Sequence, residues 1–437
     1  MNGRNGREDD GGAASPCVIE AGFSKCQSCG RHIPARVVFE NGFTYLFKDC
    51  PFEQKSFKEL LFKGKWSGSR WKRIPSYWSR TAVGENHGLD RDTRVPNRPI
   101  LSLILGAECS SRCRICRFIN WRADRERPVE FDLAAAKKAI AAHRGKTVSF
   151  CMAEPTENPF LCELISFASG RGFATVVSTN GLRLSERSYL RSLKAAGLKY
   201  IYMSFDGFDE NIYEKIRGGK HQYYLKLKAF ENIKKEKIKT GLRVVLVRKM
   251  NDDQVGPISQ YALNNNFVTE VSFQSLSLGG AEEICGFSKE NLLSVEDIKI
   301  LVGEALHLSA DHFACWNEIK IGFAAVIAGL PFIRISPFEF DTIYLLRQPD
   351  EFVPVLSESS LLRTALLFRR GGLTGLLGAC FYLSKGCIGF WLKEFILKRC
   401  VPGNSGSMVR FKVRVMCASP SSFDSSGRVL RSSIIAP

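Results

Sequence analysis

The sequence predicts an α/β protein, a partial (β/α)6 barrel preceded by a small cysteine-rich β region and followed by a mostly helical C-terminal extension. Short apolar runs alternate with longer helical patterns along the middle of the chain, which is the rhythm of parallel β/α units. Three thiols spaced CxxxCxxC in CSSRCRICRF follow the first apolar run. The predicted divisions are a disordered tail (1–16), the cysteine-rich region (17–98), the barrel (99–280) and the extension (281–437).

The first residues, MNGRNGREDDGGAASP, are polar and rich in glycine, so they predict a disordered tail. They contain no apolar stretch that would form the core of a secretory signal. Clustered thiols without such a signal favour the reducing cytosol, where cysteine clusters usually bind metal. We therefore expect a cytoplasmic protein.

The cysteine-rich region is expected to form a hairpin that brings thiols together. RVVFENGFTYLF alternates apolar and polar residues around Asn-Gly, the strongest short-range hairpin signal. Cys26 and Cys29 of CQSC precede this hairpin and Cys50 follows it, which is the arrangement of a small zinc or iron knuckle. Cys17 is a candidate fourth thiol. The alternative is a set of loose thiols among turns.

The barrel is predicted from six apolar runs joined by helical patterns. The expected strands are ILSLILGA, KTVSFCM, FATVVST, KYIYMSF, GLRVVLV and VTEVSFQSL. The expected helices are FDLAAAKKAIAAH, NPFLCELISFASG, SERSYLRSLKAAG, NIYEKIRG, YYLKLKAFENIKKEKI and QVGPISQYALNN. Six units fit an open or partial barrel better than a complete one of eight, and chemistry in such folds gathers at the strand C-termini.

The extension contains two apolar stretches, GFAAVIAGLPFI and GGLTGLLGACFYLSKGCIGFWL. The first is too short to span a bilayer. The second is long enough but carries Lys385 near its centre, so we expect a core or interfacial helix. Peripheral membrane contact, and hence a membrane-associated protein, is the alternative.

The net charge of +18 favours partners that carry phosphates or an anionic surface. No dense Lys/Arg tract with interleaved aromatic residues is present, so no specific nucleic-acid binding is predicted. A solvated basic surface is the alternative explanation of the charge.

Cys109, Cys113 and Cys116 carry the strongest chemical signal in the chain. Two thiols would suffice for a disulfide, and a closed zinc site would take four ligands. Thiolates suit iron–sulfur clusters, and a [4Fe–4S] cube held by three of them leaves one iron without a protein ligand. The alternative is a zinc site completed by a distant ligand.

The CxxxCxxC motif and the segments that follow the next strands resemble the radical S-adenosylmethionine (SAM) superfamily. In that superfamily the open iron is chelated by the amino and carboxylate groups of SAM. The reduced cluster cleaves SAM to methionine and a 5′-deoxyadenosyl radical, which abstracts a substrate hydrogen. The resemblance therefore implies a [4Fe–4S] cluster, SAM and a reducing electron donor, and it assigns no side chain as a catalytic acid or base.

The segment after the second strand, MAEPTENP, resembles the superfamily's GGEPT segment, which holds the SAM amino group. The resemblance points to Ala153, Glu154 and Pro155 as cofactor-binding residues. Met152 and Ala153 stand where the pattern has two glycines, so we expect this loop to approach the ligand less closely.

The segments after the third and fourth strands continue the resemblance. STNG resembles the TNG turn of relatives and implies Thr179 and Asn180 near SAM, although a strand-to-helix turn explains it almost as well. SFDG resembles the SxDG segment that hydrogen-bonds the ribose and carboxylate of SAM, which implies Ser204 and Asp206. Side chains two residues apart lie on the same face of a strand, so both can point into the barrel.

Two further features lie at the fifth strand. VRKMNDD resembles a loop that closes over the site, and Arg243 within the strand could reach the SAM carboxylate. A solvated position outside the barrel is the alternative for Arg243. The motifs occur in the order in which a β/α barrel would present them, and this order strengthens the resemblance.

The N-terminal region narrows the resemblance to one subgroup. CQSCGRHIPARVVFENGFTYLFKDCPF resembles the opening of enzymes that include tetraether lipid synthase and cobalamin-independent, pterin methylase-like proteins. Cys26, Cys29 and Cys50 match the metal-binding thiols of that subgroup, so a second metal ion, zinc or iron, is expected there. CPEHG is CPFEQ in this chain, and thiols expected near the C-terminus are absent except Cys417, so auxiliary clusters are not predicted.

The sequence thus predicts a radical SAM enzyme that abstracts a hydrogen and then forms a C–C bond or methylates an unactivated carbon. A lipid or a pterin-like small molecule is the expected substrate. One alternative is a degenerate radical SAM fold that serves as a binding or scaffold protein, and another is a zinc-stabilised structural protein. Five thiols of the C-terminal extension lack ligand spacing and are predicted to be buried apolar residues: Cys285, Cys315, Cys380, Cys387 and Cys400.

Overall fold

A computed structural model of the chain describes most of the predicted barrel and the cysteine-rich region. The described residues are 16–26, 29, 31–64, 100–106, 108–116, 131–278, 285–309, 312–313, 315, 342–347, 352–354, 362–364, 366–367, 410–416 and 434–435. The predicted tail up to residue 15, the linker before the first barrel strand and both apolar stretches of the extension lie outside them.

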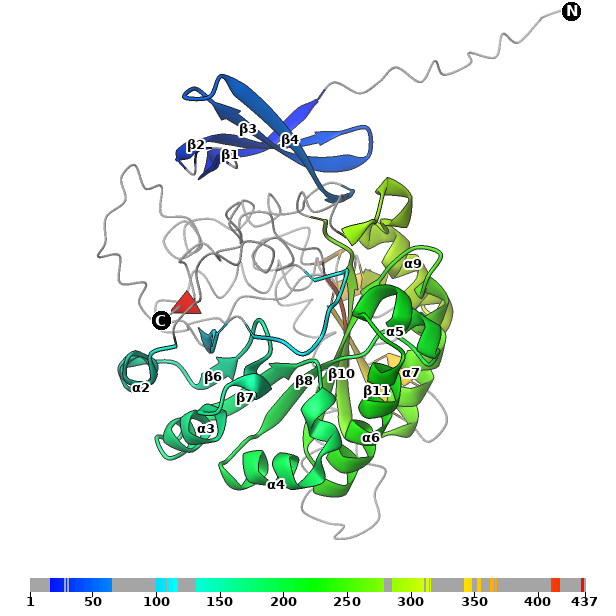
Figure 1. Cartoon of the computed structure of the whole chain (residues 1–437). Coiled ribbons are helices and arrows are strands. Elements are labelled where there is room, and N and C mark those ends of the chain that lie inside the picture. Colours follow the sequence, from blue (N-terminus) through cyan, green and yellow to red (C-terminus); the bar gives the residue numbers. More distant parts are fainter. Residues whose placement is uncertain are drawn as a thin grey trace, which may run out of the picture.

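The cysteine-rich region forms a separate four-stranded antiparallel sheet in the order β1-β2-β3-β4 (Figure 1). Its strands are β1 (Cys17–Lys25), β2 (His32–Glu40), β3 (Phe43–Cys50) and β4 (Lys55–Lys63). Asn41 and Gly42 join β2 to β3 with φ angles of 49° and 79°. Positive φ at both central residues is the mark of a type I′ turn, so the predicted Asn-Gly hairpin is confirmed.

The predicted barrel strands are confirmed in a parallel sheet that follows chain order. They are β5 (Ile100–Leu103), β6 (Thr147–Phe150), β7 (Ala174–Thr179), β8 (Tyr200–Ser204), β9 (Lys239–Leu246) and β10 (Val268–Ser275). The helices are α2 (Leu133–Ala142), α3 (Leu161–Ser169), α4 (Arg187–Ala195), α5 (Glu210–Arg217), α6 (His221–Glu236), α7 (Val255–Asn264) and α9 (Val295–Leu306). Short 3-10 turns are η2 (Pro155–Glu157), η3 (Leu182–Ser185), η4 (Asp252–Gln254) and η5 (Lys289–Asn291). Helices α3 to α7 lie along the outer side of the curved sheet (Figure 1).

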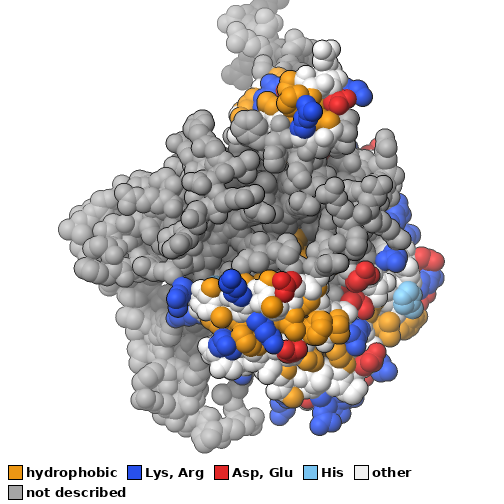
Figure 2. All heavy atoms as spheres, turned by 60° about the vertical axis from the view of Figure 1, so that its left-hand side comes forward, with side chains coloured by type: hydrophobic (Ala, Val, Ile, Leu, Met, Phe, Trp, Pro, Cys, Tyr) orange, Lys and Arg blue, Asp and Glu red, His pale blue; other side chains and the backbone are white. Residues whose placement is uncertain are grey.

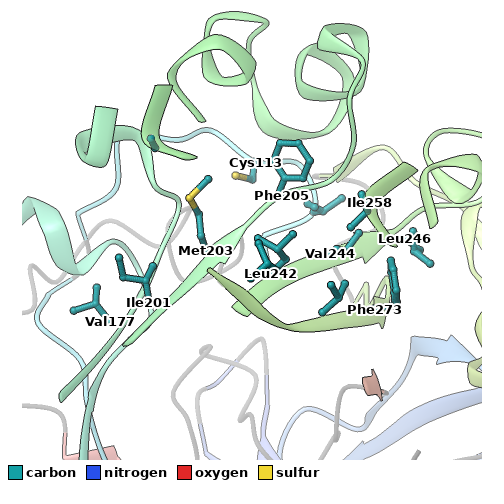
Figure 3. Packing of buried hydrophobic residues seen from close by; sticks show 14 of the residues in the cluster. Cys113, Val177, Ile201, Met203, Phe205, Leu242, Val244, Leu246, Ile258 and Phe273 are labelled. Atoms are coloured by element: carbon teal, nitrogen blue, oxygen red, sulfur yellow. The ribbon is translucent and has the colours of Figure 1, made fainter. Parts of the chain in front are cut away.

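The main hydrophobic core lies between the sheet and these helices. Every second residue of the central strands is fully buried there, including Ile201, Met203, Leu242 and Val244. Figure 3 shows these side chains packed together, and Cys113 of the same cluster is labelled among them. Burying a side chain of this size stabilises the fold by about 1.5–3 kcal/mol. Because side chains alternate between the two faces of a strand, the apolar residues occupy the face toward the helices, and the opposite face can carry polar site residues.

The described part of the extension contains strands in addition to the predicted helices. Besides α9, it supplies β11 (Thr342–Arg347), β12 (Phe352–Pro354), β13 (Arg410–Met416) and β14 (Ile434–Ile435). β13 pairs in parallel with β10, and β14 pairs with β5, so the sheet has ten strands in the order β12-β11-β13-β10-β9-β8-β7-β6-β5-β14. RFKVRVM alternates basic and apolar residues, which is a strand pattern, and β10 and β11 supply its hydrogen-bonding partners.

The cysteine-rich sheet is attached to the barrel at one corner. The backbone N–H of Leu278 donates to the carbonyl of Leu61 at 3.1 Å, which continues β4 toward the end of β10. The carboxylate of Asp297 at the start of α9 accepts from Lys63 at 3.1 Å and from Arg248 at 2.7 Å. Asp297 therefore joins β4 to the loop after β9, which is the segment predicted to close over the site.

Charges on the visible described surface are mixed. Figure 2 shows Lys and Arg side chains spread among apolar and acidic ones on this face, without one continuous basic patch. In the described part of the chain, no helix has the length and apolarity needed to cross a membrane.

Candidate functional site

The three clustered cysteines lie on a loop at the C-terminal end of β5. We call residues 108–116 the cysteine loop. Cys113 is 8% exposed, whereas Cys109 and Cys116 are half-buried. The backbone N–H of Glu154 donates to the carbonyl of Glu108 at 3.0 Å, so the loops after β5 and β6 are directly connected. The loop contains no helix or strand of its own and must be held by its neighbours.

The C-terminal end of α5 provides the main support for the cysteine loop. The last carbonyls of a helix have no partner within the helix and need donors from elsewhere. The backbone N–H of Arg114 donates to the carbonyl of Ile216 at 2.9 Å, and its guanidinium donates to the carbonyl of Lys215 at 3.2 Å. The same guanidinium reaches the carbonyl of Cys285 at 2.8 Å. One arginine thus ties the loop to both α5 and the segment before α9.

The residues just after α5 complete this support. Gly218 has φ 92°, and a Cβ atom there would lie 2.9 Å from the carbonyl oxygen of Arg112, so only glycine allows the two segments to approach this closely. The side-chain amide of Gln222 accepts from Ser111 Oγ at 2.6 Å and donates to the carbonyl of Arg217 at 2.6 Å. The continuation of the SFDG segment is therefore the platform on which the cysteine loop rests.

Two side chains donate hydrogen bonds to sulfur atoms of the loop. Asn180 Nδ2 lies 3.8 Å from Cys109 Sγ, and Arg217 Nη1 lies 3.6 Å from Cys113 Sγ. Sulfur accepts such bonds best as a thiolate, which is also the form that binds metal. Asn180 was predicted near SAM, and the structure brings its amide group to the cysteine loop.

Glu154 is buried and links the loops after β6 and β7. Its carboxylate accepts from the hydroxyl of Thr179 at 2.6 Å, the backbone N–H of Asn180 at 2.6 Å and the hydroxyl of Thr156 at 2.7 Å. The backbone N–H of Thr156 adds a fourth bond at 3.1 Å. Burial raises the pKa of Glu154, and these donors oppose that rise. Pro155 begins the short η2 turn directly after Glu154. All four hydrogen bonds are internal to the protein.

The residues before Glu154 keep a backbone that favours glycine. Met152 and Ala153 have φ angles of 69° and 45°, both in the left-handed region. The superfamily pattern has two glycines at these positions, and the loop retains the conformation without the residues that adopt it easily. A residue with a Cβ atom costs about 1–2 kcal/mol in this conformation. Such strain is typical of ligand-binding loops.

Ser204 and Asp206 of SFDG lie at the end of β8 and face different partners. Asp206 is wholly buried and accepts from Arg217 at 2.6 and 2.8 Å, and from the backbone N–H of Val245 at 3.2 Å. Ser204 Oγ accepts from Lys226 at 3.0 Å. Ser204 is half-buried, so of the two it is the one that can meet a ligand.

Lys226 is a site residue that sequence reasoning missed. Its ammonium group, wholly buried beneath the loops, donates to the carbonyl of Ser204 at 2.7 Å, to Ser204 Oγ and to the carbonyl of Asn180. All three protons are therefore used to hold the ends of β7 and β8. Burial, and then the nearby Arg217, lower the pKa of Lys226 to about 8. Its signal in the sequence is a lysine on the apolar face of α6, together with Ala229, Phe230 and Ile233.

Arg243 occupies the middle of β9 and pairs within the sheet. Its guanidinium stacks on the ring of Tyr202 at 3.9 Å and lies 3.6 Å from a carboxylate oxygen of Glu270. Arg243 therefore contacts neighbouring strands of the sheet and does not point into solvent outside the barrel. Gly241 makes room for the Tyr202 ring, because a Cβ atom there would lie 2.7 Å from it.

The second set of thiols comes together in the cysteine-rich sheet. The sulfur atoms of Cys26, Cys29 and Cys50 all lie within 4.8 Å of one another, and those of Cys29 and Cys50 are 3.7 Å apart. Tetrahedral zinc with Zn–S bonds of about 2.3 Å requires sulfur atoms about 3.8 Å apart. The donor set therefore fits three corners around a single ion. Cys17 is not the fourth ligand, because it lies at the opposite end of the nine-residue strand β1 from Cys26.

The cysteine loop has a different sulfur geometry. Among the described residues, the only metal-type group with all its ligand atoms within 4.8 Å is the N-terminal one. The sulfur atoms of Cys109, Cys113 and Cys116 are therefore spread more widely than ligands of one ion. A cube with an iron at each corner binds each thiolate to a different iron, so its thiolates do not need to lie as close together as the ligands of one ion.

Residues 103–262 match the family model described as the radical SAM superfamily. The matched segment runs from the end of β5 to α7 and contains the cysteine loop and the segments after β6, β7 and β8. The match supports the radical SAM superfamily for the core of this chain. That superfamily implies a [4Fe–4S] cluster and SAM as cofactors.

The chain is also similar in sequence to characterised enzymes. The chain is 31% identical over 275 residues to 7,8-dihydro-6-hydroxymethylpterin dimethyltransferase of Methanocaldococcus jannaschii, covering 59% of this chain and 53% of that protein. It is 33% identical over 123 residues to the S-adenosyl-L-methionine-dependent tRNA 4-demethylwyosine synthase of the same organism, covering 28% and 38%. The chain thus spans about half the length of the first relative and less of the second.

Among solved structures, the chain is similar to SuiB of Streptococcus suis bound to the precursor peptide SuiA. The TM-score is 0.40 at 15% identity, over 50% of this chain and 47% of SuiB.

Proposed function

We propose that this protein is a radical SAM enzyme whose cluster is held by Cys109, Cys113 and Cys116. The observation that carries the proposal is the CxxxCxxC loop itself: three thiols at the C-terminal end of β5, spread too widely for one ion, inside the matched segment. When bound, the cluster and SAM supply an electron and a 5′-deoxyadenosyl radical that removes a hydrogen atom from the substrate.

The chain's own residues bind and orient these groups. The backbone of Ala153, the amide of Asn180 and the hydroxyl of Ser204 are half-buried at the same edge of the sheet as the cysteine loop, so we assign them to SAM. Glu154 and Asp206 are buried and fully engaged with protein donors. We therefore assign them to fixing the loops that contact SAM rather than to direct contact.

Pro155 and Thr179 act in the same way in this proposal. Pro155 starts η2 and sets the direction of the loop after β6, while the Thr179 hydroxyl donates to Glu154 and accepts from the backbone N–H of Gly181 at 2.9 Å. These contacts hold the loops after β6 and β7 in one arrangement. Preorganised loops reduce the ordering cost of cofactor binding.

The N-terminal thiols are assigned to a zinc ion with a structural role. The 3.7 Å separation between the sulfur atoms of Cys29 and Cys50 supports a single tetrahedral ion over an iron–sulfur cube. The ion would join the CQSC turn to the end of β3. Metal analysis of the purified protein tests this assignment, which predicts one zinc per chain in addition to iron, and iron bound by Cys26, Cys29 and Cys50 would contradict it.

The substrate is proposed to be a pterin-like small molecule, and the reaction to be methylation or C–C bond formation on an unactivated carbon. Similarity to the pterin dimethyltransferase over 59% of the chain supports this choice. The sheet face that carries Ser204 also presents Tyr202 and Arg243, a ring and a guanidinium suited to a flat polar heterocycle. A lipid substrate remains the second candidate, favoured by the resemblance of the N-terminal region to tetraether lipid synthase.

The decisive experiment is SAM cleavage by the anaerobically reconstituted full chain. With dithionite and SAM, the wild-type protein is expected to release 5′-deoxyadenosine. Cys113→Ala should abolish this release, whereas Cys151→Ala, which changes a half-buried cysteine outside the loop, should retain it. No 5′-deoxyadenosine from wild-type protein with an intact cluster would contradict the proposal, and SAM binding without turnover would favour the scaffold alternative.

The substrate assignment has its own test. Adding 7,8-dihydro-6-hydroxymethylpterin and SAM to the reduced enzyme should increase 5′-deoxyadenosine formation and yield a methylated pterin. An archaeal-type phospholipid in detergent serves as the competing substrate. Stimulation by the lipid alone would overturn the pterin assignment and leave the SAM chemistry standing.

A further inference from the structure

Arg217, the last residue of α5, connects a buried carboxylate to a thiol of the cysteine loop. Its Nε and Nη2 atoms donate to Asp206 Oδ2 and Oδ1 at 2.6 and 2.8 Å. Its Nη1 atom donates to Cys113 Sγ at 3.6 Å. The Arg217 side chain is 11% exposed and that of Asp206 is 0% exposed, so water competes little for these groups.

The carboxylate that holds Arg217 is itself fixed from several sides. Asp206 Oδ1 accepts from the backbone N–H of Val245 at 3.2 Å. Its backbone N–H donates to the Tyr213 hydroxyl at 3.2 Å, and its carbonyl accepts from Asn251 at 3.0 Å. A two-point contact to a fixed carboxylate prevents the guanidinium plane from rotating. The Nη1 proton is therefore held in one direction, toward Cys113.

The contact to Cys113 differs from the hydrogen bond that Asn180 donates to Cys109 Sγ. Asn180 is neutral and lies 3.8 Å from Cys109 Sγ, whereas Arg217 carries a positive charge and lies closer. Hydrogen bonds from charged donors are stronger than neutral ones, and a low-dielectric site strengthens them further. Such a bond withdraws electron density from the sulfur, and bonds to sulfur set the potential of iron–sulfur clusters.

We propose that Arg217, oriented by Asp206, raises the reduction potential of the cluster through its hydrogen bond to the Cys113 thiolate. Arg217 is in this view a positioning residue that acts through a cluster ligand. The inference rests on the proposed function, because it takes Cys113 to be a ligand. It assigns the SFDG–IRGG segment a role in making the cluster easier to reduce, besides its support of the loop.

The test is an EPR-monitored redox titration of the reconstituted full chain without SAM. Arg217→Lys keeps a charge beside Asp206 but cannot keep both contacts, and Asp206→Asn/Arg217→Gln removes the pair without leaving a buried charge. Both variants are expected to show about a tenfold lower ratio of reduced to oxidised cluster at a fixed potential, which is a shift of about 59 mV for a one-electron couple. Arg187→Lys, which changes an arginine paired with Glu236 on the surface, should titrate as wild type.

Overlapping titration curves for the wild type and both Arg217 variants, with equal iron and sulfide content, would overturn the inference. A second measurement uses only the wild-type protein and so does not depend on the variants folding. Protein labelled with ¹⁵N in the arginine guanidinium should show a ¹⁵N hyperfine coupling to the reduced cluster in pulsed EPR. The absence of that coupling would overturn the inference as well.

The outcome separates this inference from the proposed function. If the wild type with an intact cluster releases no 5′-deoxyadenosine, the proposed function fails, while a shifted titration in Arg217→Lys still supports the role of Arg217. If SAM cleavage occurs and the titration does not shift, only the role of Arg217 fails. A wild-type chain that binds no cluster would overturn both.

Discussion

Two sets of three cysteines in this molecule are supported in different ways. Cys26 directly follows β1, Cys29 lies between β1 and β2, and Cys50 ends β3, so local backbone structure brings their sulfur atoms within 4.8 Å. The cysteine loop has no regular structure and depends on residues that are up to 172 positions away in the chain. The two sites therefore contain the same number of thiols but differ in how the surrounding structure holds them.

The difference shows how sulfur spacing selects a metal centre. A compact set held by rigid strands suits one ion with short bonds to each thiolate. A wider set on a loop, with hydrogen bonds from Asn180 and Arg217 to its sulfur atoms, suits a cluster whose irons each take one thiolate. The two sites can therefore be separated by experiment, beginning with the largest effect.

The largest effect is expected from removing one thiol at each site. Cys113→Ala should lose the iron and sulfide of the core while retaining zinc, because the two sites share no ligand. Cys29→Ala should lose zinc and retain iron. Elemental analysis of both variants measures the iron and zinc content of each. Cys162→Ala, which changes a half-buried cysteine on α3, is the control and should keep both metals. Loss of both metals in either variant would show that the sites are not independent.

Lys226→Met tests how strongly burial of Lys226 favours loss of its proton. With a pKa of about 8 in the folded protein against about 10.5 when unfolded, the native chain releases this proton first as the pH rises. The free energy of unfolding of the wild type should therefore rise with pH between 8 and 10.5 relative to Lys226→Met, by up to about 3 kcal/mol.

Urea unfolding at several pH values measures this difference. Lys228→Met, which changes an exposed lysine of the same helix, is the control and should run parallel to the wild type. A wild type and Lys226→Met that stay parallel across the same window would contradict the buried position of Lys226.

Gly218→Ala tests the platform under the cysteine loop. The left-handed backbone costs a Cβ-bearing residue about 1–2 kcal/mol, and the close contact with Arg112 adds to this, so we expect a loss of about 2–3 kcal/mol and weaker iron retention. Gly172 has a similar φ of 81° but open space around its Cβ position. Gly172→Ala should therefore lose only the backbone part and keep its iron. Equal iron retention in both variants would mean that the Arg112 contact does not matter.

The smallest effect is expected at the strained loop after β6. Ala153→Gly should stabilise the protein by about 0.5–1 kcal/mol, because relief of the left-handed conformation exceeds the added freedom of the unfolded chain. Ala139→Gly within α2 should instead destabilise by a similar amount. Thermal unfolding of the two variants measures their changes in stability, which should have opposite signs. A loss of stability in Ala153→Gly would contradict backbone strain at this position.

The sequence predicted the strands, helices and hairpin because their signals are local. Apolar runs, helical spacing and Asn-Gly each act over a few residues, and all six barrel strands and the β2–β3 turn follow from them. The site was predicted in part from motif spacing. Asp206 and Glu154 were predicted to contact SAM. Their burial was not predicted, since it depends on contacts with Arg217 and with Thr179.

The contacts that were missed join distant parts of the chain. Ser111 and Gln222 are 111 positions apart, and Arg217 and Cys113 are 104 apart, so no local pattern pairs them. The strands of the extension were missed for the same reason, since the β13 pairing partner is β10. The sequence held only indirect signals, such as a lysine on the apolar face of α6 and an arginine followed by two glycines at the end of α5.

The most direct test of the central claim is EPR of the reduced, reconstituted protein with and without SAM. A cluster held by Cys109, Cys113 and Cys116 with one open iron should give a signal that changes shape when SAM is added. The signal should survive in Cys29→Ala and vanish in Cys113→Ala. A signal that SAM leaves unchanged, or one that persists in Cys113→Ala, would contradict the assignment of the cysteine loop.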